Sequence, residues 1–265
     1  MDRSAELDRE RSFARPAAFA AFGAVGLYIV SVIVEQSSGL QTDGPKNEQL
    51  LSFHDDSGVL LLATGIRAIG FLLISLPLLH LFRAAKLRSE RVRPEMVGFA
   101  FFGPALLAIQ GVLSWLATLG VANDFVDQAG GNAHPAVLAQ RLVDDSNFRK
   151  VASALVIPAI LALAIGLLYI SLQAMRTGLL TRFAGSLGMA LGAAMILIFP
   201  LALPAMMVWL IFVGLTFLGI APRGRPPAWE AGEAIPWPTP GERAAAELSP
   251  PPEDSGGLDE EGRSG

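Results

Sequence analysis

Cysteine is absent from the 265-residue chain, and histidine occurs only three times. Without thiols the protein forms no disulfide, binds no metal through thiolates and uses no cysteine nucleophile. Three histidines are too few for a histidine-rich metal site. Charged residues make up only 17% of the chain, which is low for a soluble domain of this length.

Short catalytic and nucleotide-binding motifs are also missing. The sequence contains no His-Glu-x-x-His pair, no Gly-x-Ser-x-Gly elbow, no Gly-Lys-Ser/Thr phosphate loop and no dinucleotide fingerprint. Basic residues are not interleaved with aromatic residues in the pattern that binds nucleic acid. The sequence therefore predicts a protein that is not an enzyme and that uses no cofactor, no metal site and no nucleic-acid partner.

Apolar residues make up just over half of the chain, and they gather in long runs. A bilayer-spanning helix needs about 20 predominantly apolar residues, and six runs approach or exceed that length. The expected fold is an all-α, polytopic transmembrane helical bundle of six spans in contact with the lipid bilayer. The spans are expected at residues 17–34, 58–82, 96–121, 151–175, 183–199 and about 205–220.

Two parts of this layout have an alternative interpretation. A charged start followed by an apolar run also fits a cleaved signal peptide, although residues 35–41 offer no small-x-small cleavage site. The last two spans are short and meet at a corner between Pro200 and Pro204, so they could form a re-entrant hairpin instead. Both arrangements leave the C-terminus on the same side.

Lysine and arginine are distributed unevenly among the loops. The segments before the first span and after the second, fourth and sixth spans hold 15 of the 20 basic residues, whereas the alternate loops hold four. Cytoplasmic loops of membrane proteins carry such an excess of positive charge. The pattern predicts a multi-pass protein of the cell membrane with both termini in the cytoplasm.

Composition divides the chain into a polar segment at 1–16, a transmembrane domain at 17–220 and a tail at 221–265. The tail is rich in proline and acidic residues, so we expect it to be disordered and available to a protein partner. Trp229 and Trp237 are exceptions within it. Their indoles are expected to rest at the inner membrane interface, or else to form a docking motif for a partner.

The two longer outer loops share one layout. Each contains a short amphipathic helix, expected at 45–53 and 135–143, and each ends in Asp-Asp-Ser immediately before a span. In the first helix Leu50, Leu51 and Phe53 are expected to lie against the membrane surface. The layout suggests tandem helical hairpins, with the last two spans as a reduced third hairpin.

The Asp-Asp-Ser triplets allow two interpretations. Aspartate and serine before a helix cap its free amides and complement its dipole, which is the interpretation we adopt. Four carboxylates, with His54 beside the first triplet, could instead hold a divalent cation or serve an enzyme at the outer face. The triplets consist of Asp55, Asp56 and Ser57, and of Asp144, Asp145 and Ser146.

Arg67 is a lone charge within an apolar run. An arginine at the bilayer centre costs roughly 2.5–3.5 kcal/mol on insertion scales, so it requires a partner. No carboxylate is expected at its depth, and Gln110 on the next, antiparallel span is the best-matched polar group. We therefore assign Arg67 and Gln110 as the candidate ligand-binding pair, for an anion or polar solute. The alternative is a structural tie between helices, or snorkelling toward the surface.

Small residues recur every fourth position in two of the later spans, a pattern that allows helix backbones to approach closely. We expect these stripes to pack inside the bundle. They consist of Ala154, Pro158, Ala162 and Gly166, and of Ala184, Gly188 and Gly192.

The turn RTGLLTRFAGSLG at 176–188, together with the six-span layout, resembles uncharacterised families of bacterial integral membrane proteins. The resemblance covers most of residues 17–220 and implies the bacterial inner membrane, but it implies no activity and no site residues. The expected function is that of a non-enzymatic membrane scaffold, regulator or assembly component. The alternative is a small-solute transporter or channel-like protein that uses Arg67.

Overall fold

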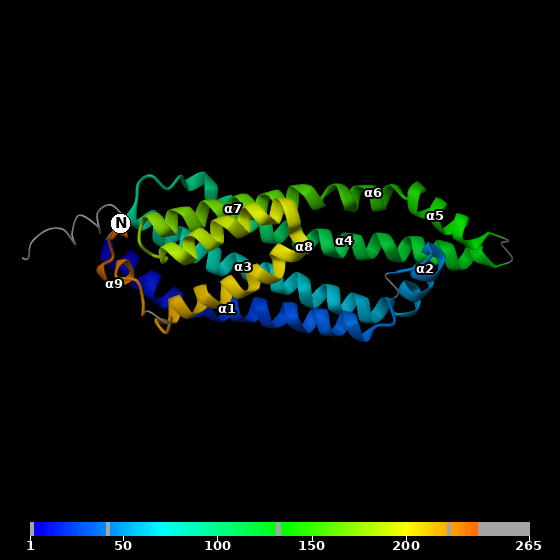
Figure 1. Cartoon of the computed structure of the whole chain (residues 1–265), viewed down its shortest axis with the longest axis horizontal. Helices are drawn as coiled ribbons and strands as arrows, with labels where there is room; N and C mark the ends of the chain where they lie inside the picture. The colour runs from blue at the N-terminus through cyan, green and yellow to red at the C-terminus, as the bar shows by residue number, and fades with distance from the viewer. Residues whose placement is uncertain (1–2, 41–42, 131–133, 222–223, 238–265) are drawn as a thin grey trace, which may run out of the picture.

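The computed structural model of the chain describes residues 3–40, 43–130, 134–221 and 224–237. These residues form helices and no strands, which confirms the all-α prediction. Five of the described helices are long and apolar enough to cross a bilayer, as is compatible with a multi-pass membrane protein. The long helices lie side by side in an elongated bundle (Figure 1).

Four of the long helices form two antiparallel hairpins. The first hairpin pairs α1 (Arg3–Ser37) with α3 (Ser57–Arg88), and the second pairs α4 (Val97–Ala129) with α7 (Val156–Arg176). The hairpins join through α3 and α4, and a 3₁₀ turn, η1 (Pro94–Met96), lies between these two helices. Helix α1 begins within the charged N-terminal segment and continues without interruption through the first predicted span.

Three short helices belong to the half of the bundle that lies away from the N-terminus (Figure 1). The helices α2 (Lys46–Asp55) and α5 (Pro135–Asp145) lie at its end, and α6 (Asn147–Ala154) continues the line of α7. The first two confirm the short helices expected in the outer loops. The expected membrane contact of α2 is wrong in part: Leu50 is buried in a small cluster with Phe125 of α4, and Phe53 packs against that cluster. Leu51 alone of the three is 42% exposed.

The predicted fifth and sixth spans form a single element, α8 (Arg182–Leu218), that folds back on itself. A straight helix would place Ala184 and Trp209 roughly 37 Å apart. Instead the Trp209 indole Nε1 donates a hydrogen bond to the Ala184 carbonyl oxygen at 2.9 Å. The bend lies at Ile198, whose φ of −140° and ψ of 50° are not helical. Figure 1 shows this bend near the middle of the bundle, so the fifth and sixth predicted spans form one helical hairpin and the six-span count is not confirmed.

Proline explains the position of the bend. Pro200 and Pro204 lie two and six residues after Ile198, and each lacks the amide that would continue the helical ladder. The tip of the hairpin is apolar and open, since Leu197 is 81% exposed and Leu201 is 72% exposed. In the bundle the two arms of α8 pack against α7 and α1.

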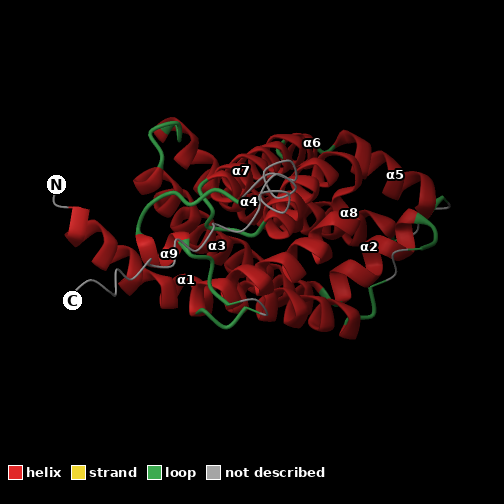
Figure 2. Ribbon diagram, turned by 60° about the vertical axis from the view of Figure 1, so that its left-hand side comes forward, coloured by secondary structure: helices red, strands yellow, loops and turns green. Residues whose placement is uncertain are grey.

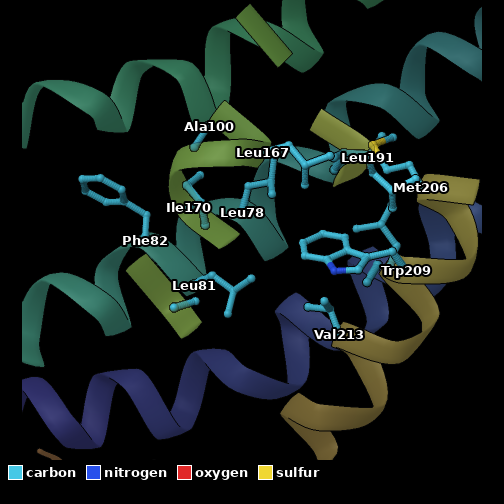
Figure 3. Close-up of a cluster of buried hydrophobic side chains, with 14 of the residues drawn as sticks. Leu78, Leu81, Phe82, Ala100, Leu167, Ile170, Leu191, Met206, Trp209 and Val213 are labelled. Atoms are coloured by element: carbon cyan, nitrogen blue, oxygen red, sulfur yellow. The ribbon is translucent and has the colours of Figure 1, made fainter. Parts of the chain in front are cut away.

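The main core lies where the α8 hairpin meets the other long helices. Figure 3 shows Trp209 of α8 beside a cluster that includes Leu78, Leu167 and Ile170. Close approach of α8 to α7 depends on glycine, because a Cβ atom at Gly192 would lie 2.8 Å from the Ala164 carbonyl oxygen. The second stripe, Ala184, Gly188 and Gly192, is therefore buried inside the bundle, as predicted. The prediction is wrong for the start of the first stripe, because Ala154 and Pro158 are exposed and only Gly166 is buried.

The chain ends, as far as the structure describes it, at the same end of the bundle where it begins (Figure 2). A short helix, α9 (Ala228–Ala231), lies there against the start of α1 and the end of α3 (Figure 1). Disorder was expected for the whole of 221–265, but residues 224–237 are folded onto the bundle. The rest of the predicted disordered tail, 238–265, lies outside the described residues.

Candidate functional site

Arg67 does not contact Gln110. The Arg67 guanidinium forms an ion pair with Glu35 of α1, and its Nε donates a hydrogen bond to the Ser31 hydroxyl at 3.2 Å. Gln110 instead donates to Ser114 Oγ within its own helix, at 2.7 Å. The expected pairing is therefore wrong, and Arg67 ties α3 to α1 rather than to α4.

The helix boundary explains this correction. The apolar run ends at residue 34, so Glu35 was assigned to a loop, but α1 continues to Ser37. Glu35 thus stays on the helix, one turn beyond Ser31 on the face toward α3. Arg67 reaches along α3 toward the bundle end that carries α2, and its side chain remains 30% exposed. The Arg67 guanidinium therefore has a carboxylate partner, Glu35, that the pattern of apolar residues did not predict.

The two Asp-Asp-Ser triplets behave differently from each other. Ser146 caps α6 by accepting a hydrogen bond from the Arg149 amide at 3.3 Å, which confirms the capping interpretation there. In the first triplet the Asp56 carboxylate makes no capping bond to α3 and accepts the Gly39 amide at 2.8 Å. It therefore fixes the loop that follows α1.

A metal site is not formed by these triplets. His54 Nδ1 lies 3.0 Å from the Asn123 side-chain oxygen. Within the described ranges, no three His, Asp or Glu side chains are grouped closely enough to bind a metal ion.

A buried group of charged and aromatic side chains lies at the opposite end of the bundle, where the N-terminal helix meets the C-terminal segment. Arg88, the last residue of α3, forms a two-pronged ion pair with Glu10 of α1, with N–O distances of 2.6 and 2.9 Å. The Arg88 side chain is fully buried and that of Glu10 is 5% exposed. Further Arg88 donors reach the Ala228 and Ala84 carbonyl oxygens at 3.0 and 2.9 Å. The buried charge is thus satisfied from three segments of the chain.

Trp229 occupies the centre of this group. Its indole Nε1 donates to the Leu179 carbonyl oxygen at 2.9 Å, and only 2% of the residue is exposed. The ring stacks on His80 with a centroid distance of 5.4 Å, and the Arg88 and Arg225 guanidiniums lie 5.5 and 4.9 Å from it. Such cation–π contacts are attractive when they are shielded from water. We call this set the Trp229 cluster: Glu10, His80, Arg88, Phe217, Arg225 and Trp229.

A second tryptophan fastens the same segment to the turn between α7 and α8. The Trp237 indole donates to the Leu180 carbonyl oxygen at 2.8 Å, and Arg182 donates to the Trp237 carbonyl oxygen at 3.1 Å. The turn accommodates this segment through Gly178, whose φ is +76° and whose missing Cβ leaves room for the Ile235 carbonyl. Residues 177–182 thus form a docking site for residues 225–237.

The structure gives the indoles of both tryptophans partners within the chain. Their indoles were expected either at the membrane interface or in a motif that binds another protein. In the structure each indole N–H instead pairs with a backbone carbonyl of the chain's own α7–α8 turn. The two tryptophans could be identified from the sequence as candidate contact residues, because each is a large aromatic side chain isolated in a polar, proline-rich stretch. The buried ion pair of Glu10 and Arg88 could not be predicted in this way, since both residues lie in segments where charged side chains are common.

Arg225 has an unusual electrostatic environment. Burial lowers the pKa of the Arg225 guanidinium from its ordinary value, and the neighbouring Arg88 and Arg11 act in the same direction. The carboxylates of Glu10 and Glu230 act in the opposite direction. Arginine still remains protonated in proteins, so the end of the bundle carries a partly desolvated positive charge.

Comparison of the chain with models of protein families, with functionally characterised proteins and with solved structures finds no significant match.

Proposed function

We propose that the protein is a non-enzymatic scaffold or assembly component of the membrane, which holds its acidic C-terminal tail at the cytoplasmic face. The docking of residues 225–237 through Trp229 carries this proposal. Trp229 contacts α3, α8 and the α7–α8 turn, so the segment that precedes the tail is fixed by buried contacts. Such a fixed attachment keeps the tail at one place on the bundle, where a partner can bind it.

Charge and apolar exposure support the placement in a membrane. The end of the bundle that holds the Trp229 cluster also carries the basic loops, and basic loops favour the cytoplasm. Exposed apolar side chains run along the long helices and over the tip of α8, where Leu197 is 81% exposed. Lipid is the solvent in which such a surface is stable. We therefore propose that both termini are cytoplasmic and that α8 is a re-entrant hairpin.

The tail composition suits a binding role. Residues 238–265 contain seven acidic residues, two arginines and five prolines. A partner for this segment would carry a basic surface, because the tail has excess negative charge. The lipid bilayer and this protein partner are the two interactions that we propose.

A small-solute transporter is the second candidate. The observation that favours it is that the chain covers the Arg67–Glu35 pair only in part, with 30% and 40% of the two side chains exposed. The Arg67–Glu35 ion pair weighs against a transporter. To bind an anion there, the Arg67 guanidinium would have to release Glu35 and pair with the solute instead. An inert tie between α1 and α3 accounts for the same contacts.

Quantitative co-purification tests the scaffold proposal. The full-length chain, a chain ending at residue 237 and an Arg67→Leu variant are each solubilised from native membranes after mild crosslinking. The proteins that co-purify are then compared by mass spectrometry. A scaffold should lose its specific partners on truncation and keep them in the Arg67 variant. Identical partners in all three preparations would contradict the tail's role.

Reporter fusions test the orientation. Fusions near residues 90, 180 and 237 should report the cytoplasm, and fusions in the loops at 40–45 and 130–134 should report the opposite side. Opposite locations for the fusions near 90 and 180 would refute the proposed topology.

A further inference from the structure

A cleft of about 600 Å³ lies between the two arms of α8 and the docked segment at the end of the bundle. Arg182 and Phe183 line it from the start of α8, and Phe212 lines it from the return arm. Arg225 and Trp237 close it from the docked segment. The cleft therefore exists only while residues 225–237 are folded onto the bundle.

Positive charge dominates this cleft. Two arginines contribute to its lining, and none of the described lining residues is acidic. The Nε atom of Arg225 is buried and has no hydrogen-bond partner among the described residues. Arg182 uses one donor on the Trp237 carbonyl oxygen and, like any guanidinium, has four more. The two arginines thus leave donors unused beside the same space.

The cleft also has an apolar side that opens outward from the bundle. Phe183, in the first turn of α8, is 71% exposed, and Phe212 lies beside the same cleft. An exposed phenylalanine at the end of a membrane hairpin is in the position of the belts that meet lipid near the headgroups. A ligand that fits both sides is amphiphilic, with an anionic head and an apolar chain.

We propose that this cleft binds the phosphate headgroup of an anionic phospholipid from the cytoplasmic leaflet. Arg182 and Arg225 donate to the phosphate oxygens, as guanidiniums do in paired geometry. An acyl chain extends along Phe183 and Phe212 into the bilayer. Since Arg225 and Trp237 belong to the docked segment, the lipid also stabilises the docking itself. The proposal rests on the membrane placement given above, and it does not depend on what the tail binds.

Native mass spectrometry of the full-length protein in detergent tests this proposal. Phosphatidylglycerol and phosphatidylcholine with identical acyl chains are titrated against the wild type, an Arg182→Gln/Arg225→Gln variant and an Arg91→Gln control. Arg91 is an exposed cation at the same end of the bundle, so its loss removes charge without altering the cleft. The wild type should prefer phosphatidylglycerol. The double variant should lose affinity for it by about tenfold, equivalent to about 1.4 kcal/mol. The control should change by less than about twofold.

Further measurements keep the test decisive if the double variant folds poorly. Phe183→Asn alters an exposed position, and it should weaken phosphatidylglycerol binding while leaving the elution profile of the protein unchanged. Inorganic phosphate at millimolar concentration should not displace the lipid, and displacement would identify a site for free phosphate instead. Equal binding of the two lipids, or equal losses in Arg91→Gln and the double variant, would overturn the proposal. Because the titration does not measure tail partners, failure of the scaffold proposal remains distinguishable from failure of this one.

Discussion

Replacing Glu10 with glutamine should destabilise the protein far more than the same change at Glu35. Both carboxylates pair with an arginine of α3, so the two variants remove the same chemical group from similar ion pairs. Their environments differ. The Glu10 side chain is 5% exposed and its partner Arg88 is fully buried, whereas Glu35 and Arg67 are 40% and 30% exposed.

The expected magnitudes follow from this difference in burial. Removal of one partner of a buried ion pair leaves an uncompensated charge and costs about 3–5 kcal/mol. Arg88 keeps hydrogen bonds to Ala84 and Ala228, so we expect the lower end of that range, about 3 kcal/mol, for Glu10→Gln. Glu35 lies two residues before the end of α1, so we expect its pair with Arg67 to meet water rather than lipid. A water-exposed pair contributes about 0–1 kcal/mol, and this bounds the loss for Glu35→Gln.

The assay is reversible unfolding in mixed micelles with increasing dodecyl sulfate, followed by tryptophan fluorescence. A double variant, Glu10→Leu with Arg88→Met, provides the control, because removal of both charges should restore much of the stability lost in Glu10→Gln. Equal losses for Glu10→Gln and Glu35→Gln would refute the reasoning from burial. A double variant that is less stable than Glu10→Gln would refute the assignment of the loss to an unpaired Arg88.

Three other substitutions probe separate parts of the structure. Trp229→Phe removes an indole hydrogen bond worth about 1 kcal/mol, and limited proteolysis should then cleave residues 225–237 faster than in the wild type; an unchanged cleavage rate would show that the bond does not hold the segment. Gly192→Ala introduces a methyl group against α7 and should cost about 1–3 kcal/mol in the same unfolding assay. Gly111→Ala, where the added Cβ meets no neighbouring helix within 4 Å, should be neutral or stabilising, and a similar loss in both variants would contradict the packing argument. Arg67→Leu should leave the stability within about 1 kcal/mol of the wild type if the residue is only an exposed tie, whereas a larger loss would assign it a greater structural role.

The long helices were predictable from the sequence because lipid permits few backbone arrangements. Apolar runs of membrane length must satisfy their own amides, which makes a helix the default there. The short helices α2 and α5 followed from amphipathic spacing, and Ser146 followed from local capping chemistry. The bend in α8 was signalled by Pro200 and Pro204, but composition could not decide between a corner outside the bilayer and a hairpin within it.

The pairings between helices were not predictable in the same way. Whether Arg67 meets Gln110 or Glu35 depends on how far α1 continues past its apolar run and on which neighbour faces the arginine. Neither is a property of a single segment. Glu10 and Arg88 are 78 positions apart in the sequence, and their contact arises only once α1 and α3 are packed. Hydropathy describes each helix alone, so such contacts require the assembled bundle.

The half-length hairpin α8 has a consequence for the shape of the molecule in a bilayer. Its two arms add cross-sectional area only on the side of the bundle that holds the basic loops, because the bend lies near the middle of the bundle (Figure 1). In the membrane placement that we propose, lipid chains would fill the space beyond the tip, alongside α1 and α7. The molecule would then be a wedge, broader in one leaflet than in the other, and such a wedge would concentrate where the bilayer curves to match it.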